Sequence, residues 1–145
     1  MSVRIIVDST ADVSATIRDR LTVVPLTIHF GDEEYIDGVT ITHTTFYEKL
    51  IESDVLPTTS QATPDNFAQI FAEVAAAGDS AVVLTLSSQL SGTYQSACIA
   101  AMDHPDIIHV VDSQSVAIGT GILAERALAM VDNGLPAANI ATQLT

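Results

Sequence analysis

The chain has 145 residues, a formal net charge of −13 and only five lysine and arginine residues. So few cations leave no basic patch for nucleic acid, and anionic membranes should repel the chain. Apolar residues make up 48% of the sequence, which suffices for a domain with a real core, but they are interrupted too often for stable membrane insertion. Surface charge is screened within about 8 Å at physiological salt, so a small anion is still an admissible ligand.

The chain begins with an apolar run at residues 4–7 that predicts a buried, parallel strand. It ends in the polar turn of residues 8–12, at a position where open α/β sheets place ligand groups, although an Asx turn or a cap would use the same residues. Asp12 or Ser14 is expected to cap a short helix that continues through Leu21.

Residues 22–30 are expected to be extended, with Pro25 breaking any regular central strand. His29 alternates with apolar neighbours and is therefore expected on the less buried face. Residues 31–34 predict a hairpin turn. Residues 42–53 predict an amphipathic helix.

A hydroxyl-rich loop is expected over residues 55–64. Thr63 as N-cap and Pro64 at the first helical position predict a helix through Ala77. The next apolar run, residues 81–86, predicts a second buried strand, which leads into a further polar turn.

The last third of the chain continues the alternation of strands and helices. Residues 93–102 and 116–130 predict helices, residues 107–111 predict a strand, and Pro136 is expected to start a final helix. Residues 112–115 form another polar turn after a strand. The order predicts an α/β fold, with a parallel sheet flanked by helices and a β-hairpin excursion, whose polar turns meet on one rim.

The turn of residues 87–91, between a buried strand and a helix, concentrates the donors of the sequence. The helix N-terminus presents free N–H groups, Ser91 and Thr93 add hydroxyl groups, and Gly92 allows close approach of a ligand. This equipment suits an oxyanion such as a phosphate or a carboxylate. The alternative is that Ser91 is only an N-cap and that the other hydroxyl groups fill a tight turn.

Several kinds of site are not indicated. The sequence contains no P-loop, dinucleotide-binding glycine motif or nucleophile elbow, and its four histidines are scattered. We therefore expect no metal, no cofactor and no catalytic residue, and we interpret Cys98 as a small core residue. The absence of a signal-peptide pattern predicts a cytoplasmic protein.

The motifs together resemble those of the DegV family of bacterial fatty-acid-binding proteins. The matching segments follow one another across nearly the whole chain: Val7 to Asp12, Val24 to Leu26, Gly31 to Tyr35, Asp37 to Val39, Pro57 to Gln61, Ser87 to Ala97, and Asp112 to Ser115 with Gly119. Ala62 departs from the pattern, because the family's loop usually carries proline there.

The resemblance implies an α/β domain related to those of dihydroxyacetone kinase and the sugar phosphotransferase system. It also implies that a long-chain fatty acid is bound by its carboxylate, with Thr59 and Ser91 at the positions of the family's carboxylate-binding threonine and serine. In the family the acid is presented to a separate acyl kinase for phospholipid synthesis. A second, C-terminal domain covers the acyl chain there and contributes a histidine, and residues 1–145 are expected to form the N-terminal domain without it.

We therefore predict a lipid-binding carrier domain that is not an enzyme and that dimerises if its apolar surface stays uncovered. The candidate ligand-binding residues are Thr59, Ser60, Ser91, Gly92, Thr93, Ser9 and Ser115. The alternatives are a phosphoryl- or acyl-transfer enzyme that uses Ser91 or a histidine, and a protein-interaction module with acidic docking surfaces.

Overall fold

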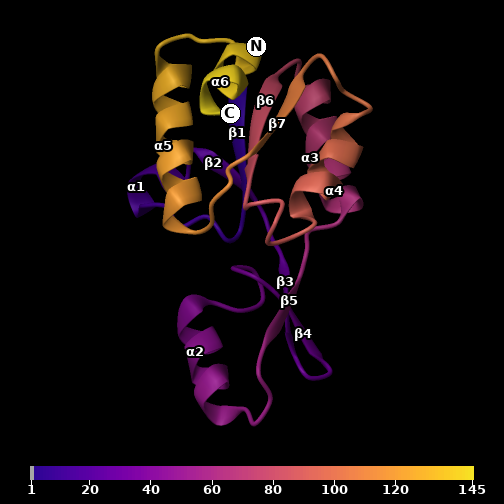
Figure 1. Cartoon of the computed structure of the whole chain (residues 1–145), viewed down its shortest axis with the longest axis vertical. Helices are drawn as coiled ribbons and strands as arrows, with labels where there is room; N and C mark the ends of the chain where they lie inside the picture. The colour runs from indigo at the N-terminus through magenta and orange to yellow at the C-terminus, as the bar shows by residue number, and fades with distance from the viewer. Residues whose placement is uncertain (1) are drawn as a thin grey trace.

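A parallel sheet in the order β2-β1-β6-β7 forms the centre of the molecule (Figure 1). The computed structural model describes residues 2–145. Its strands are β1 (Val3–Asp8), β2 (Leu21–Val24), β6 (Ser80–Thr85) and β7 (Ile108–Asp112). Within the sheet, Ile6 pairs with Thr22 on one side and with Val83 on the other. Apolar runs form these strands because a parallel sheet that is covered on both faces offers no polar surface.

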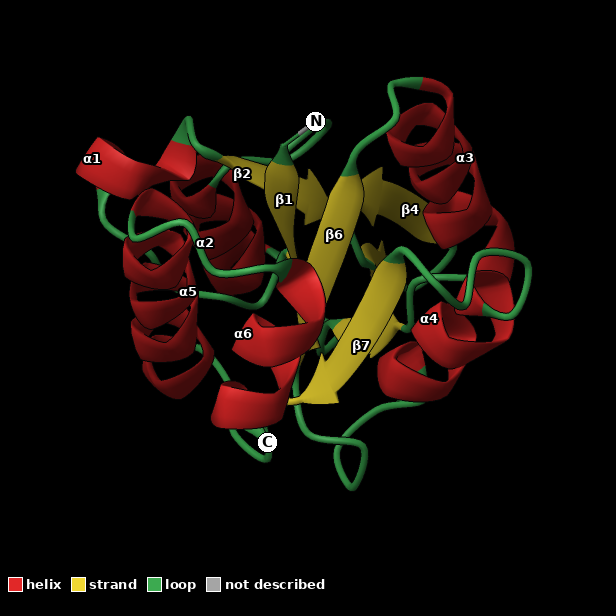
Figure 2. Cartoon of the chain, turned by 90° about the horizontal axis from the view of Figure 1, so that it is seen from above, coloured by secondary structure: helices red, strands yellow, loops and turns green. Residues whose placement is uncertain are grey.

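Helices cover both faces of this sheet (Figure 2). On one face, α5 (Ile118–Asp132) and α6 (Ala137–Leu144) pack on Ile5, Val82 and the other inward residues of that side. On the opposite face, α3 (Pro64–Ala76) and α4 (Thr93–Ala101) pack on Ile6, Val83 and their neighbours. Successive residues of a strand point to opposite faces, which divides the core into these two layers. The short helix α1 (Ala15–Arg18) lies beside α5 (Figure 1). We call this part, residues 2–25 and 61–145, the body.

Residues 26–60 form a smaller lobe at the carboxyl end of the parallel strands (Figure 1). It contains an antiparallel sheet in the order β4-β3-β5, made of β3 (Thr27–Phe30), β4 (Glu33–Ile36) and β5 (Thr58–Ser60). Helix α2 (His43–Glu52) packs on one face of this sheet, with the Phe46 ring centroid 5.6 Å from that of Phe30. The predicted α/β class and hairpin excursion are confirmed, and so is the interruption of the extended segment at Pro25.

The structure differs from the sequence-based prediction in two segments. Helix α1 ends at Arg18, and Leu21 begins the edge strand β2 instead of ending a helix. Residues 58–60 pair with β3 as a strand and are not loop throughout. In both places hydrogen bonds to a strand distant in sequence override the local pattern.

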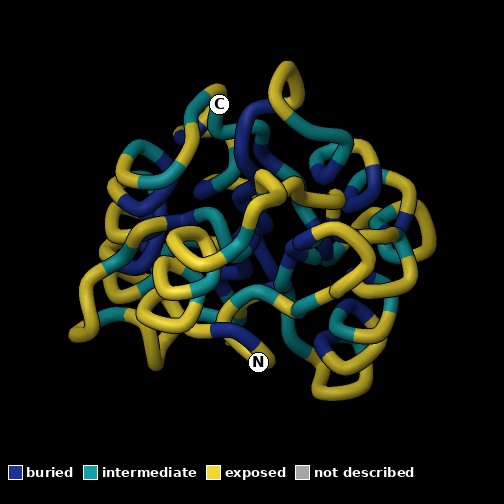
Figure 3. The backbone as a smooth tube through the Cα atoms, turned by 90° about the horizontal axis from the view of Figure 1, so that it is seen from below, coloured by how far each residue is buried: buried dark blue, intermediate teal, exposed yellow. Residues whose placement is uncertain are grey.

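The apolar face predicted for α2 is largely exposed. Tyr47 is 60% and Ile51 85% exposed, and none of the residues of α2, all within the described part of the chain, is buried. Seen from below, the segments of the chain nearest the viewer consist mainly of exposed residues (Figure 3). Over residues 2–145, no helix has both the length and the apolar composition needed to cross a bilayer.

Two glycines in the first turns of α5 are explained by close packing. A Cβ atom at Gly121 would lie 2.0 Å from the backbone oxygen of Asp12, and one at Gly119 would lie 1.8 Å from Oγ of Ser115. Glycine lowers helix stability, but here it lets α5 approach the turn after β1. The helix therefore holds the turns after β1 and β7 close to each other.

Candidate carboxylate-binding site

The polar turns after β1, β6 and β7 meet on one rim, because the strands are parallel. Asp8 is fully buried at the end of β1, and its Oδ2 accepts a hydrogen bond of 2.7 Å from the Leu86 amide after β6. Its Oδ1 accepts from the Thr10 amide at 2.8 Å and from the Thr10 hydroxyl. Asp8 therefore joins the turns after β1 and β6. This is a structural role, which the sequence had allowed as the alternative to ligand binding.

Asp112 has a similar role at the end of β7. Its Oδ1 accepts from the Ser88 amide at 3.2 Å and from the Gln114 amide at 2.9 Å, and its Oδ2 accepts from the Ser88 hydroxyl at 2.5 Å. Burial raises the pKa of Asp112, but the hydrogen bonds from Ser88 and Gln114 outweigh burial and hold the pKa below its ordinary value. No group of three or more potential metal ligands occurs between residues 2 and 145.

The turn after β6 is tied to the turn after β7 and leads into α4. The Ser87 amide donates to the Ser115 carbonyl at 2.7 Å, and the Ser91 amide donates to the Ser87 carbonyl at 3.2 Å. The N-cap residue of α4 is Gly92. Oγ of Ser91 nevertheless accepts from the Thr93 amide at 3.2 Å and lies 2.9 Å from Oγ1 of Thr93. Ser91 thus combines a capping contact with a partly exposed hydroxyl.

The segment after Thr59 runs directly against this turn. The Ala62 amide donates to Oγ1 of Thr93 at 3.3 Å, and Nε2 of Gln61 donates to Oγ of Ser96 at 3.3 Å. A Cβ atom at Gly92 would lie 2.0 Å from Oε1 of Gln61. The space above Gly92, which the sequence suggested for a ligand, is therefore taken by a side chain of the chain itself. These contacts bring the Thr59 segment and the Ser91 turn to one rim, as predicted.

The pleat of β5 separates two candidate hydroxyl groups that are adjacent in sequence. Thr59 pairs with Ile28 and shares the face of the small sheet that α2 covers. Ser60 pairs with Thr27 on the opposite face, where its Oγ lies 2.6 Å from Nε2 of His29. Side chains that alternate along a strand point to opposite faces, so Thr59 and Ser60 do not serve one ligand atom together.

A buried hydroxyl that the sequence did not single out lies at the end of β6. Thr85 is fully buried, and its Oγ1 has no hydrogen-bond partner among the residues described. Strand alternation places it on the face of Ala81 and Val83, which α3 and α4 cover. The sequence pattern did not distinguish it, because it ends an otherwise apolar run. An unpaired buried hydroxyl is costly unless a water or a ligand atom satisfies it.

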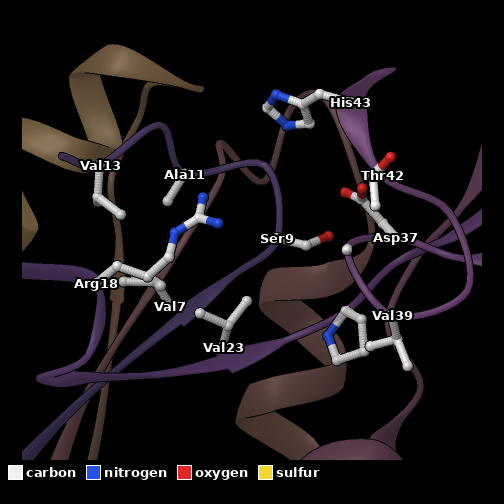
Figure 4. Close-up of a pocket in the computed structure, with 12 residues that line it drawn as sticks. Val7, Ser9, Ala11, Val13, Arg18, Val23, Asp37, Val39, Thr42 and His43 are labelled. Atoms are coloured by element: carbon white, nitrogen blue, oxygen red, sulfur yellow. The ribbon is translucent and has the colours of Figure 1, made fainter. Parts of the chain in front are cut away.

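A cavity of about 390 Å³ opens beside this rim, between the body and the lobe (Figure 4). Its walls combine apolar with a few polar side chains: Val7, Ala11, Val13, Val23, Pro25 and Val39, with Ser9, Arg18, Asp37, Gly38, Thr42 and His43. Oγ of Ser9 accepts from the Leu26 amide at 2.9 Å, which leaves its own hydrogen free to donate. The sequence indicated Ser9 as a candidate but not the valine-rich cavity around it.

The fold and the site together define the class of protein. A parallel sheet covered on both faces, with hydroxyl and amide donors at the carboxyl ends of its strands and a mainly apolar cavity beside them, defines an α/β domain of the class in which ligands bind at that end of the sheet. The sequence model of the DegV family, described as an uncharacterised protein family, matches residues 2–145. The chain belongs to the DegV family.

Relatives support this membership in sequence and in structure. A DegV domain-containing protein of Clostridium perfringens is 37% identical over 136 residues, which are 92% of this chain and 49% of that protein. A DegV family protein from Thermus thermophilus, whose structure is described as fatty-acid-binding, superposes with a TM-score of 0.88 at 34% identity and covers 99% of this chain and 52% of its own. DegV from Bacillus subtilis, described as a fatty acid binding protein, superposes with a TM-score of 0.89 at 29% identity, over 99% of this chain and 52% of its own. The chain spans about half the length of the relatives that it matches.

Proposed function

We propose that this domain binds a long-chain fatty acid by its carboxylate and acts as a carrier, with no catalytic step at the carboxylate site. The observation that carries the proposal is that a donor-rich turn, Ser91 to Thr93, lies on the same rim of the sheet as a mainly apolar cavity that Ser9 lines. Its membership of a family with fatty-acid-binding members from T. thermophilus and B. subtilis supports the same ligand class.

The energetics of such a ligand match the two parts of the site. A carboxylate that leaves water needs several hydrogen bonds, and we assign two of these to the hydroxyl groups of Thr59 and Ser91. Gly92 and Thr93 are assigned none, because Gln61 fills the space above Gly92 and the Thr93 amide already donates to Ser91. Each methylene that is buried contributes about 0.8 kcal/mol. The cavity of about 390 Å³ is near the lower end of the range of about 300–1,000 Å³ typical of ligand sites, so it holds part of a long acyl chain.

Two of the other candidate residues, Ser9 and Ser115, support the proposed site. Ser9 lines the cavity, and Ser115 supports the Ser91 turn through its carbonyl. Ser60 faces away from Thr59, and we assign it no part in holding the carboxylate.

We further propose that the bound acid is presented to a separate acyl kinase in the cytoplasm. In this proposal the chain serves as the N-terminal domain of such a carrier, and a C-terminal domain completes the cover over the acyl chain. Where that cover is missing, the exposed side chains Tyr47, Ile51 and Leu56 favour dimerisation.

The rival interpretation is an acyl- or phosphoryl-transfer enzyme in which Ser91 is the nucleophile. Oγ of Ser91 contacts the hydroxyl and amide of Thr93, and no histidine of the described chain bonds to it. A serine hydroxyl without a base is a poor nucleophile. The contacts of Ser91 therefore favour binding over catalysis.

Calorimetry with a long-chain fatty acid tests the proposal, together with mass spectrometry of lipid that copurifies with the protein. Thr59→Ala and Ser91→Ala should each weaken binding by about 1.5–3 kcal/mol, the range for a hydrogen bond to a charged group. The double variant should be non-additive because both side chains share one ligand. Thr58→Ala is the matched control, since Thr58 lies one residue away on the opposite face of β5, and it should bind as the wild type does. Unchanged affinity in both single variants would defeat the assignment of these residues.

A further inference from the structure

The face of the small sheet that α2 does not cover carries a serine, a histidine and a glutamate in line. Nε2 of His29 lies 2.6 Å from Oγ of Ser60, and its Nδ1 lies 3.6 Å from Oε1 of Glu34. We propose that Ser60, His29 and Glu34 form a nucleophilic site that cleaves carboxylic esters or thioesters. This inference is independent of the proposed fatty-acid carrier function.

The register of the small sheet creates this arrangement. His29 lies on the central strand β3 and pairs directly with Glu34 on β4. Ser60 on β5 pairs with Thr27, two residues before His29, and therefore lies on the same face at a diagonal. Each strand thus contributes one member, and a nucleophile, a base and an orienting carboxylate follow one another across the sheet.

This face is open to a reactant. The His29 side chain is 23% and the Glu34 side chain 71% exposed. The partly exposed Ile36 pairs with Thr27 and so lies on the same face, where it offers an apolar contact for a short acyl group. β5 is an edge strand of this sheet, and an edge strand presents backbone N–H groups that no neighbouring strand pairs. An amide of that kind next to Ser60 would donate to the oxyanion of an attacked carbonyl.

The chemistry follows from these positions. As Oγ of Ser60 attacks the carbonyl carbon of an ester, its proton passes to Nε2 of His29, and Glu34 stabilises the resulting imidazolium. The bond from the carbonyl carbon to the leaving oxygen or sulfur then breaks, and the leaving group takes the proton from His29. Water, deprotonated by His29, attacks the acyl group on Ser60 and releases the carboxylic acid with Ser60 restored. No oxidant, metal or cofactor enters the balance.

Ser60, unlike Ser91, has a base next to its hydroxyl group, which activates a serine as a nucleophile. Its hydroxyl has an imidazole within hydrogen-bond distance, whereas Ser91 has a threonine. The sequence does not show this pairing, because Ser60 and His29 lie 31 residues apart. The structure therefore points to Ser60 as the acyl-accepting serine.

The test uses the full chain with p-nitrophenyl butyrate as ester and a fluorophosphonate as covalent probe. The wild type should release nitrophenol and carry one phosphonate on the peptide that contains Ser60. Ser60→Ala should abolish both, and His29→Gln should slow hydrolysis about 100-fold or more, the usual contribution of a general base. Glu34→Gln should have a smaller effect. Thr58→Ala, an exposed hydroxyl residue on the same face, should react as the wild type does.

Rescue distinguishes catalysis from a merely structural contact. Added imidazole should restore part of the activity of His29→Gly, which a packing role of His29 would not allow. Circular dichroism of each variant checks that the lobe is folded. A wild type without hydrolysis or labelling at Ser60, or a Ser60→Ala variant that hydrolyses at the wild-type rate, would overturn the proposal. Neither outcome bears on fatty-acid affinity, which Thr59→Ala and Ser91→Ala report separately.

Discussion

The body and the lobe are built by the same chain but differ in how completely their sheets are covered. In the body, helices lie on both faces, and Ile6, Val82 and Val83 are fully buried. In the lobe, one face of the sheet packs on α2, and the buried cluster is limited to Ile28, Phe30 and Ile41. The extensive core of the body therefore fixes the turns at the ends of its strands, whereas the stability of the lobe depends on a few aromatic contacts.

This difference matters for binding because the proposed donors come from both parts. Ser91 belongs to the body and Thr59 to the lobe, and side chains of both parts, such as Ser9 and Thr42, line the cavity. A ligand that contacts both parts would bind only while the lobe is folded. Because binding to the folded state adds to the stability of that state, the ligand would stabilise the lobe. Hydrogen exchange in the lobe should slow when a fatty acid is bound.

The largest expected effect comes from truncating an aromatic residue in each part. Phe71→Ala should destabilise the whole chain by about 3–5 kcal/mol, because Phe71 is fully buried in the body. Phe30→Ala should open the lobe and leave the body folded, because its cluster is separate from the body's core. Denaturant titration with hydrogen exchange by mass spectrometry measures both. If Phe30→Ala reduced protection in the body as much as in the lobe, the two parts would not be separable in this way.

A smaller effect is expected from the carboxylate that joins two turns of the body. Asp8→Ala leaves the Leu86 amide without its acceptor. The cost should be about 1.5–3 kcal/mol, the range for a hydrogen bond to a charged group. Asp12→Ala is the control, since Asp12 is exposed, and it should change stability by less than about 0.5 kcal/mol. Equal effects of both variants in denaturant titrations would contradict a joining role for Asp8.

The pH dependence of stability should be modest and should involve Asp112. Its pKa is lowered in the folded state, so its stabilising contribution is present above the unfolded pKa of about 3.9 and is lost as pH falls through the folded pKa. Asp112→Asn should therefore lower stability at pH 7 and flatten its decline below about pH 4. Thermal unfolding at several pH values measures this. A variant whose stability falls with acid as steeply as that of the wild type would show that other groups dominate.

The smallest change in stability is expected for a substitution on the exposed surface of the lobe. Ile51 is 85% exposed, so Ile51→Ser should alter the free energy of unfolding by less than about 0.5 kcal/mol. Binding of a hydrophobic dye and any self-association should nevertheless fall, because the residue contributes to an exposed apolar surface. Ile99→Ser, at a 55% exposed position on α4 in the body, is the matched control. A strictly monomeric wild type that binds no dye would contradict the predicted association.

Local sequence determined many of the strands and helices of the body. The apolar runs of β1, β6 and β7 cannot be exposed without a large hydrophobic cost, so their burial follows from composition alone. Helix α3 begins after Thr63 with Pro64 in its first turn, as predicted. The start of this helix depends on neighbouring residues alone, because the Thr63 hydroxyl accepts a hydrogen bond from the Asn66 amide in the same turn. The order of motifs was likewise sufficient to indicate the DegV family.

Only the tertiary structure decided which donors share a surface. Thr59 and Ser60 are neighbours in sequence, but pairing of β5 with β3 turns them to opposite faces. The same pairing joins Ser60 to His29, and the approach of Gln61 to Gly92 fills space that the sequence suggested for a ligand. The local pattern in residues 55–64 predicted a loop, because the strand forms only when β3 supplies hydrogen-bond partners from a distant part of the chain.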